Sequence, residues 1–195
     1  MIITLSGAPG SGKTSVAKLL AQRLGVPFHS VGGLRGEMAL ERGVTVDELN
    51  RIGEDDRSTD ELVDELQRRL GETEDDFVIE GRLSWHFIPR SFKVYLDCDP
   101  KEAARRVFAS RRLEEGRDDE PPYATVEDAE RAIAARVASD VLRYRRHYGI
   151  DYRDTSHYDL VVDTTESPGP EAVADRILAA LPSGDVPPRT SEAGA

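Results

Sequence analysis

The feature that most constrains this chain is a glycine-rich segment directly after the apolar run Ile2–Leu5. Its residues are Gly7, Ala8, Pro9, Gly10, Ser11, Gly12, Lys13 and Thr14. A short strand, this loop and a helix that begins at Lys13 predict a phosphate-binding loop, because backbone N–H groups freed by glycine converge on an anion at the positive end of a helix. A glycine-rich turn with a surface lysine is the alternative. The strand before the loop and the helix after it argue against that alternative.

The side chains of such a loop have defined tasks. We expect Lys13 to reach the β- and γ-phosphates of a nucleotide as a point charge. The Thr14 hydroxyl should coordinate the Mg2+ that bridges those phosphates, and the adjacent Ser15 should belong to the same nucleotide site. The loop by itself therefore indicates a nucleotide-dependent protein.

Length and charge narrow the class of protein further. The 195 residues fit one domain with a sizeable core. The 37 acidic residues outnumber the 26 basic ones and give a formal charge of -11, which argues against a nucleic-acid-coating surface and a polybasic membrane anchor. Cys98 is the only cysteine, so a reducing cytoplasm and a core position are the simpler expectation. No apolar run approaches the roughly 20 residues of a membrane helix. We expect a soluble, cytoplasmic monomer or weak dimer that acts on small molecules.

Apolar runs and helical periodicity alternate along the chain. Besides the strand before the loop, strands are expected at residues 26–29, 77–80, 92–96 and 158–162. Helices are expected at residues 13–24, 34–42, 46–52, 59–70, 100–112, 126–148 and 170–181. This pattern predicts an α/β fold of three layers, in which a five-stranded parallel sheet has helices on both faces and binds ligands at the carboxyl ends of its strands.

Two segments depart from this alternation. Residues 113–125 hold an acidic run with two prolines between arginine-bearing helices, which is typical of a mobile lid over a phosphate-transfer site; an ordinary acidic loop is the alternative. Residues 182–195 have almost nothing to bury, so we expect a disordered tail after a domain at residues 1–181.

Candidate catalytic groups follow the predicted strands. Glu80 and Arg82 close the strand at residues 77–80, where a carboxylate can hold a metal-bound water and an arginine can bind a phosphate. Asp97 follows the next strand and is either a competing metal carboxylate or a buried cap for the helix after it. The sequence leaves open which of these strands lies beside the loop.

One helical face carries further candidates. Arg136, Asp140 and Arg143 lie on the same face of the helix at residues 126–148, beside its apolar stripe and hence at the edge of the core. Asp140 can pair with both arginines and orient them towards a transferring phosphoryl group. A solvent-exposed face of salt bridges is the commoner explanation of such a pattern taken alone.

Several segments together resemble a known family. They are GAPGSGKT at residues 7–14, VIEGRL at residues 78–83, and RYRRHYGID followed by YDLVVDTT at residues 143–151 and 158–165. In this order they resemble the cytidylate kinases, in the short archaeal-type form also found in some bacteria, from Met1 to about Leu181. The resemblance implies a nucleoside monophosphate kinase fold, with a helical monophosphate-binding region at about residues 30–72 and a small lid at about residues 112–127.

The resemblance also implies roles for individual residues. Those implied for catalysis are Lys13, Arg82, Arg136, Arg143 and Asp140; for ATP, the loop with Ser15, Arg106 and Arg112; for the acceptor, Arg35, Asp60 and Arg82; and for Mg2+, Thr14 and Glu80. Within these, Asp60 falls in the region that reads the pyrimidine. Arg106 and Arg112 fall where the family uses arginine near the adenine and phosphates of ATP.

One departure from the family concerns the acceptor. The resemblance implies a segment like GDIxRE, whereas residues 32–37 of this chain read GGLRGE. Arg35 stands one residue away from the commonest register, and Gly36 takes that place. This difference weakens the assignment of the acceptor more than the assignment of ATP.

The activity implied by the resemblance is transfer of the γ-phosphoryl group of ATP to CMP or dCMP. Such a transfer brings two polyanions together, so the site must neutralise charge and exclude water, while the acceptor oxyanion needs no strong base. We expect Arg82, Arg136 and Arg143 to supply most of the rate. A kinase for AMP, UMP or a small hydroxylated metabolite is the alternative. A GTP-binding module is less favoured, because the only asparagine, Asn50, is followed by arginine and not by the lysine of a guanine-reading motif.

Overall fold

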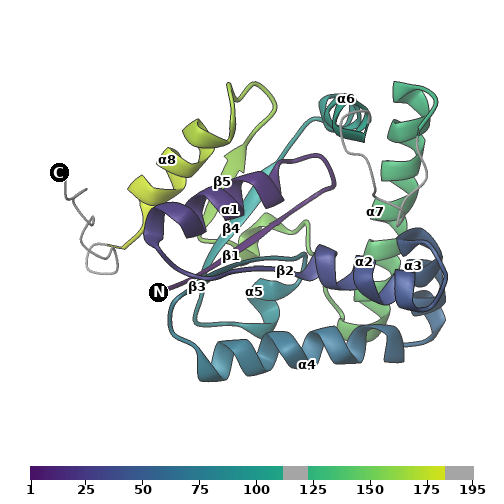
Figure 1. Cartoon of the computed structure of the whole chain (residues 1–195), viewed down its shortest axis with the longest axis horizontal. Coiled ribbons are helices and arrows are strands. Elements are labelled where there is room, and N and C mark those ends of the chain that lie inside the picture. The colour runs from purple at the N-terminus through teal and green to yellow at the C-terminus, as the bar shows by residue number, and fades with distance from the viewer. Residues whose placement is uncertain (112–122, 183–195) are drawn as a thin grey trace.

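The computed structural model describes residues 1–111 and 123–182. Within them, five strands form one parallel sheet in the order β2-β3-β1-β4-β5 (Figure 1). The strands are β1 (Ile2–Gly7), β2 (Phe28–Ser30), β3 (Phe77–Glu80), β4 (Phe92–Asp97) and β5 (Leu160–Asp163). The helices are α1 (Lys13–Leu24), α2 (Val31–Glu41), α3 (Val46–Asp55), α4 (Ser58–Thr73), α5 (Ser84–Phe87), α6 (Pro100–Arg111), α7 (Val126–Tyr148) and α8 (Pro170–Ala180), with a 3-10 turn η1 (Thr155–His157). The predicted α/β fold with a five-stranded parallel sheet is confirmed.

The strand before the glycine-rich loop lies at the centre of the sheet. β1 is buried along its whole length and pairs with β3 on one side and β4 on the other. Because β3 and β4 lie on opposite sides of β1, the strand order reverses at β1. Open α/β sheets bind ligands at the carboxyl ends of the strands at such a switch point. Both strands that carry candidate metal carboxylates flank the loop.

Alternation along β1 divides the core into two layers. Ile3 and Leu5 pack with α1 and α8 on one face of the sheet, whereas Ile2 packs with Phe77 and the α5 and α7 side chains on the other. Figure 1 shows α1 and α8 on one side of the strands and α4 and α5 on the other. This is the predicted three-layer arrangement.

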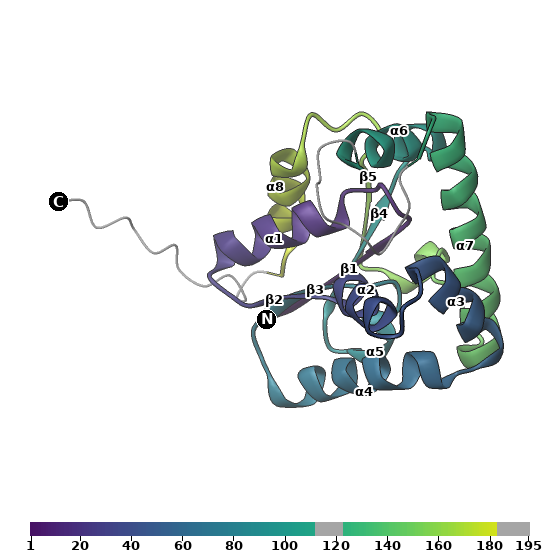
Figure 2. The ribbon, with the colours of Figure 1, turned by 45° about the vertical axis from the view of Figure 1, so that its right-hand side comes forward.

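The long helix α7 stands beside the sheet and reaches both α6 and the helices that follow β2 (Figure 2). Thr125 and Asp128 form a capping box at its start, and Gly149 ends it in a left-handed conformation, with φ of 71°. Its packing against α3 and α6 places α7 side chains between the predicted acceptor region and the glycine-rich loop.

The boundaries of α2 and β5 differ from the prediction. The helix expected to begin at Leu34 begins at Val31, because the side chain of Ser30 accepts a hydrogen bond from the Gly33 N–H and so caps it despite the two glycines that follow. The last strand begins at Leu160 and not at Tyr158, whose hydroxyl instead donates to the Tyr152 carbonyl.

The short helix α5 was not predicted. It has a single turn, too short for an apolar period to show in sequence. Its Trp85 packs into the core beneath the sheet and stacks on His157.

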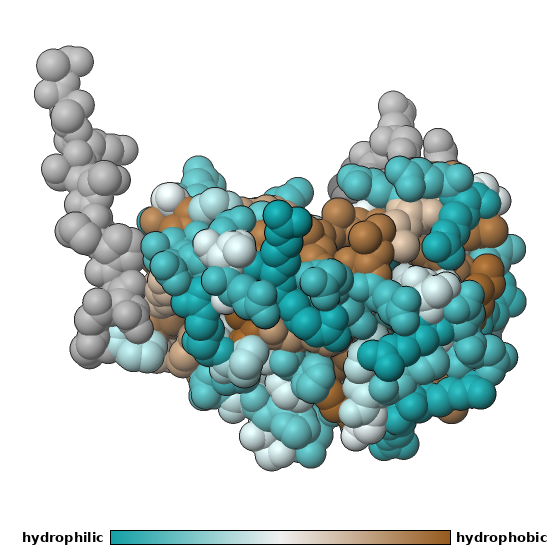
Figure 3. Space-filling view, turned by 90° about the horizontal axis from the view of Figure 1, so that it is seen from below, coloured by the Kyte–Doolittle hydropathy of each residue, from teal (hydrophilic) through white to brown (hydrophobic). Residues whose placement is uncertain are grey.

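The surface is largely hydrophilic. Figure 3 views the molecule from the side of α4, where hydrophilic residues cover most of the face and apolar patches lie between them. Across residues 1–111 and 123–182, none of the helices is both long and apolar enough to span a bilayer.

Candidate active site

The glycine-rich loop wraps around a space at the carboxyl end of β1. Gly10 has a positive φ of 80°, and a Cβ on it would lie 2.5 Å from the Ala103 carbonyl oxygen of α6. Gly12 also has a positive φ, of 86°, but a Cβ there would meet nothing within 4 Å. Gly10 is therefore required both by backbone conformation and by the close approach of α6.

A cavity of about 580 Å3 lies in front of this loop and gathers residues from seven helices and strands. The cationic side chains that line it include Lys13 of the loop, Arg82 after β3, Arg106 of α6 and Arg136 of α7. Thr14 and Glu80 supply oxygen atoms, and Gly32, Gly33 and Asp47 line it from α2 and α3. The predicted ATP loop, the metal candidates Thr14 and Glu80, and three predicted arginines thus share one cavity.

Lys13 is held within this cavity by the loop itself. Its Nζ donates to the Ala8 carbonyl oxygen at 2.7 Å. Burial, with Arg82 close by, lowers the pKa of Lys13 to about 7. A polyanion in the cavity would favour the charged form of this lysine.

The two candidate metal carboxylates, Glu80 and Asp97, lie in different surroundings. Glu80 is 5% exposed, lines the cavity, and pairs in register with Leu5 of β1 and Ser30 of β2. Asp97 is exposed, lies outside the cavity lining and accepts the Cys98 N–H through Oδ1 at 2.9 Å.

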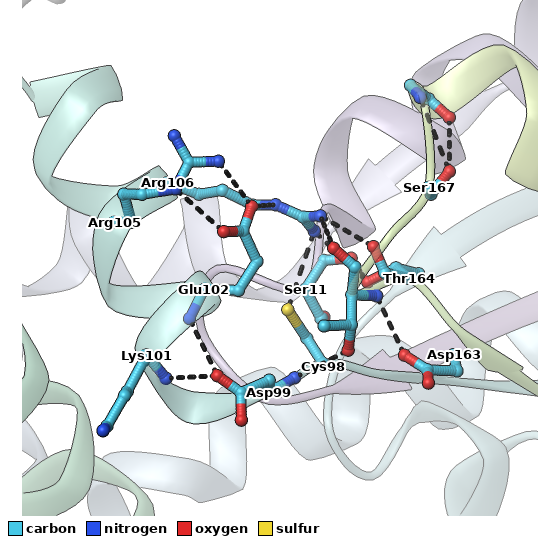
Figure 4. Close-up of polar contacts among 12 residues, drawn as sticks. Ser11, Cys98, Asp99, Lys101, Glu102, Arg105, Arg106, Asp163, Thr164 and Ser167 are labelled. Carbon is cyan, nitrogen blue, oxygen red and sulfur yellow. Dashed lines mark hydrogen bonds and ion pairs between the residues drawn. The ribbon is translucent and has the colours of Figure 1, made fainter.

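The alternative of Asp97 as a buried helix cap is wrong. Asp99 caps α6 instead, because its Oδ1 accepts the N–H groups of Lys101 and Glu102 at 2.9 and 3.1 Å (Figure 4). Cys98 follows β4 directly and is buried, as predicted for a core residue.

Asp140 joins two arginines from different elements. Its carboxylate lies 2.7 Å from Arg82 Nε and 2.8 Å from Arg143 Nη2, and Asp140 is 1% exposed. Burial alone would raise the pKa of the Asp140 carboxyl, but the surrounding arginines outweigh burial and hold that pKa below its ordinary value. Burial would lower the pKa of the Arg82 guanidinium group, but Asp140 together with Tyr152 and Tyr144 outweighs burial and raises that pKa.

The predicted position of this helical face is wrong for two of its three residues. Asp140 and Arg143 are fully buried and do not lie at the edge of the core, and the solvent-face alternative fails for the same reason. Arg82, 58 residues before Asp140, lies beside it only in the fold, which the helical pattern could not show. Arg136 is partly exposed and lines the cavity.

A second buried carboxylate extends this network towards α2. Asp60 Oδ1 accepts from Arg143 Nη1 at 2.5 Å and also from Arg35 Nη1. Arg35 further donates to Asn50 Oδ1 at 3.1 Å and to the Thr59 carbonyl at 3.3 Å. We call Arg35, Asp60, Arg143, Asp140 and Arg82 the buried ion network.

Residues of the buried ion network differ in whether they line the cavity. Arg82 lines the cavity, whereas Arg35, Asp60 and Arg143 lie behind the lining and are bound to one another. Gly53 permits this packing, because a Cβ on it would lie 3.1 Å from Arg143 Cδ and 2.6 Å from Thr59 Oγ1.

Arg106 uses its hydrogen-bond donors within the protein (Figure 4). Nε donates to Glu102 at 2.8 Å, Nη1 to Cys98 Sγ and Thr164 Oγ1 at 3.6 and 3.3 Å, and Nη2 to the carbonyls of Thr164 and Thr165 at 2.7 and 3.0 Å. These bonds occupy the guanidinium edge. The Arg106 side chain is 27% exposed and lines the cavity.

Thr164 is a site residue that sequence reasoning missed. Its hydroxyl lies 3.2 Å from the Ser11 carbonyl and 2.9 Å from the Asp97 carbonyl, so it connects the loop to the ends of β4 and β5. The threonine pair that begins two residues beyond the last predicted strand was the available signal.

Some predicted residues lie outside this description. Arg112 and most of the predicted lid at residues 112–127 fall beyond the described residues, as does the predicted tail from residue 183. Tyr123, within the predicted lid, is described and lines the cavity.

Comparison with known proteins places this site in context. Residues 2–166 match the model of the cytidylate kinase-like family. The chain is 37% identical to the cytidylate kinase of Methanocella arvoryzae over 85% of this chain and 89% of that protein, and 36% identical to the cytidylate kinase of Archaeoglobus fulgidus over 93% and 94%. Among solved structures it resembles shikimate kinase from Bacteroides thetaiotaomicron, with a TM-score of 0.58 and 21% identity over 93% of this chain and 99% of that one. This last likeness concerns the fold alone.

Proposed function

The chain belongs to the cytidylate kinase-like family, and we propose that it transfers the γ-phosphoryl group of ATP to CMP or dCMP. The observation that carries the proposal is the convergence of Lys13, Arg82 and Arg136 on a cavity that opens at the glycine-rich loop. Such a site neutralises the two polyanions that phosphoryl transfer brings together.

The residues present fit a magnesium ion. Mg2+ prefers oxygen ligands and keeps several waters, with one or two protein groups and the phosphates of the substrate completing its shell. The Thr14 hydroxyl and the Glu80 carboxylate both line the cavity beside the loop. Thr14 would bind the ion directly and Glu80 would hold its waters; the bound ion would neutralise charge on the β- and γ-phosphates.

Lys13 and the loop hold the donor nucleotide in this proposal. The backbone of the loop surrounds the phosphates, and Lys13 exchanges its bond to the Ala8 carbonyl for the phosphate oxygens. Arg106 offers its flat face to the adenine ring, since its edge is occupied by Glu102 and the threonine carbonyls.

Arg82 and Arg136 neutralise charge on the phosphoryl group in flight and on the acceptor. The acceptor is already an oxyanion, so the chemistry needs no general base, and among the described residues no histidine lines the cavity. Arginines so placed contribute about 10^3 to 10^5 in rate in related phosphoryl transfers.

Arg143 and Asp140 act as positioning residues. Asp140 fixes the guanidinium group of Arg82 from behind, and Arg143 fixes Asp140. Arg35 and Asp60 tie the same network to α2 and α4, the predicted acceptor region. The acceptor helices are thereby linked to the arginine that meets the phosphates.

A coupled assay of ADP release with ATP, Mg2+ and a panel of acceptors tests this function. We expect selective turnover of CMP or dCMP over UMP, AMP, GMP and shikimate. Preferential turnover of another acceptor would leave the assignment of ATP as the donor intact and overturn the assignment of CMP or dCMP as the acceptor. Absence of turnover with the whole panel would contradict kinase activity.

A further inference from the structure

Ser30 lies where the acceptor region meets the candidate metal carboxylate. It is the last residue of β2, faces Glu80 in the parallel register of β2 and β3, and caps α2. Ser30 also lines the cavity.

The direction of its two hydrogen bonds is fixed by chemistry. The Gly33 N–H donates to Ser30 Oγ at 3.0 Å, and the Ser30 hydroxyl donates to Glu80 Oε1. A hydroxyl carries one proton and a backbone N–H can only donate, so the order cannot be reversed while Glu80 is a carboxylate. The backbone of α2 is thus connected through one hydroxyl to one oxygen of Glu80.

The glycines that begin α2 cannot orient Glu80 as Ser30 does. The first turn of α2 contains Gly32 and Gly33, which have no side chains to orient Glu80. A Cβ on Gly32 would lie 3.5 Å from Glu80 Oε1, and one on Gly33 would lie 3.3 Å from Ser30 Oγ. Neither glycine therefore contributes a polar side chain to the Ser30–Glu80 pair.

We infer that Ser30 is a positioning residue that orients Glu80 towards the metal-bound nucleotide and couples it to the start of the acceptor helix α2. Ser30 donates to Oε1, and the remaining lone pairs of the Glu80 carboxylate would hold the waters of the metal. A shift of the first turn of α2 when the monophosphate binds would reach Glu80 through this hydroxyl. The inference rests on the proposed function, because the metal enters with the nucleotide.

Substitutions at Ser30 separate this role from helix capping. Ser30→Gly keeps a residue that caps helices nearly as well and removes the bond to Glu80, whereas Ser30→Ala removes both. Ser30→Thr retains both bonds. Thr45→Ala is the matched control, because it removes the side-chain cap of the adjacent helix α3 without touching Glu80.

The measurement is the affinity for Mn2+ in the presence of ADP, determined from the electron paramagnetic resonance signal of the free ion. We expect Ser30→Gly and Ser30→Ala to weaken Mn2+ binding by about 10- to 100-fold, the usual effect of removing a partner of a metal-site carboxylate. Ser30→Thr should restore wild-type affinity. Thr45→Ala should lower the thermal midpoint and leave Mn2+ affinity unchanged.

The outcomes distinguish this inference from the function beneath it. Equal Mn2+ affinity in wild type and Ser30→Gly would overturn the role of Ser30 while the proposed kinase remains. Equal weakening by Thr45→Ala would also overturn it, since helix capping would then explain the effect. Failure of the wild-type protein to hold Mn2+ with ADP would contradict the proposed function and the inference together.

Discussion

The two halves of the cavity are built on different principles. The nucleotide half depends on backbone conformation within one short loop, where Gly10 combines a positive φ with the close approach of α6. The acceptor half depends on side chains far apart in sequence: Arg143 reaches Asp60, 83 residues away, and Asp140 reaches Arg82. Local sequence therefore specifies the first half, and only the assembled fold specifies the second.

The comparison also separates charge that faces the substrate from charge that faces the protein. Lys13, Arg82 and Arg136 line the cavity, whereas Arg143 is fully buried between two carboxylates. Substitutions in the first group should mainly affect turnover, whereas substitutions in the second should lower stability and reach turnover only through Asp140 and Arg82.

Loss of Lys13 should cause the largest loss of activity, through the nucleotide half of the cavity. In Lys13→Met the phosphates lose the one lysine that the loop places against them, and we expect kcat/KM to fall by about 10^3-fold or more. Steady-state kinetics with ATP and CMP provides the measurement. Lys18→Met, an exposed lysine on the same helix that also lines the cavity, is the comparison and should lose far less. Equal losses in the two variants would refute the special role of Lys13.

Two arginines on α7 allow the effect of a substitution on stability to be distinguished from its effect on turnover. Arg143→Met leaves Asp60 and Asp140 buried with one partner fewer each, so the free energy of unfolding should fall by about 3 to 5 kcal/mol. Arg136→Met should change that free energy by about 1 kcal/mol or less and reduce kcat by about 10^2-fold. Urea unfolding followed by Trp85, the only tryptophan, and initial rates report the two effects. A fully stable Arg143→Met would refute the stabilising role of Arg143 between Asp60 and Asp140.

Nucleotide affinity should depend on pH through Lys13. Its pKa of about 7 in the free protein rises when phosphates bind, so binding above pH 7 takes up a proton and apparent affinity falls by up to about tenfold per pH unit. Calorimetry in buffers of different ionisation enthalpy should show uptake close to one proton at about pH 8.5 and little at about pH 6. Lys13→Arg, charged throughout this range, should show no such uptake. Uptake that persists in Lys13→Arg would assign the proton to another group.

The smallest effect should come from the hydroxyl that ties the loop to the sheet. Thr164→Val removes the contact with the Ser11 carbonyl and an acceptor of Arg106, so KM for ATP should rise several-fold with little change in kcat. Thr165→Val is the matched control, because its hydroxyl only accepts the Asp99 N–H. Unchanged KM in Thr164→Val would show that the loop holds its shape without this tie.

The extent of successful prediction follows the same division. The loop, the order of strands and helices, and the sheet with helices on both faces were readable because glycine positions and hydrophobic periods are local signals. Sequence could not reveal that Arg82 and Arg143 share Asp140, since no local period relates positions in different elements. The capping role of Ser30 was also hidden, because Gly32 and Gly33 obscured the start of α2. Arg35 was placed correctly on a helix, but its burial against Asp60 depends on α4.

The central claim is that the cavity-lining arginines Arg82 and Arg136 meet the phosphates while the other members of the buried ion network, Arg35, Asp60, Asp140 and Arg143, stay bound to one another. A crystal structure with a bisubstrate analogue, in which a polyphosphate chain joins adenosine to cytidine, tests this claim most directly. The account predicts phosphate oxygens within hydrogen-bond distance of Lys13, Arg82 and Arg136, with Arg143 still bound to Asp60 and Asp140. A structure in which Arg143 leaves both carboxylates and binds the phosphates would contradict it.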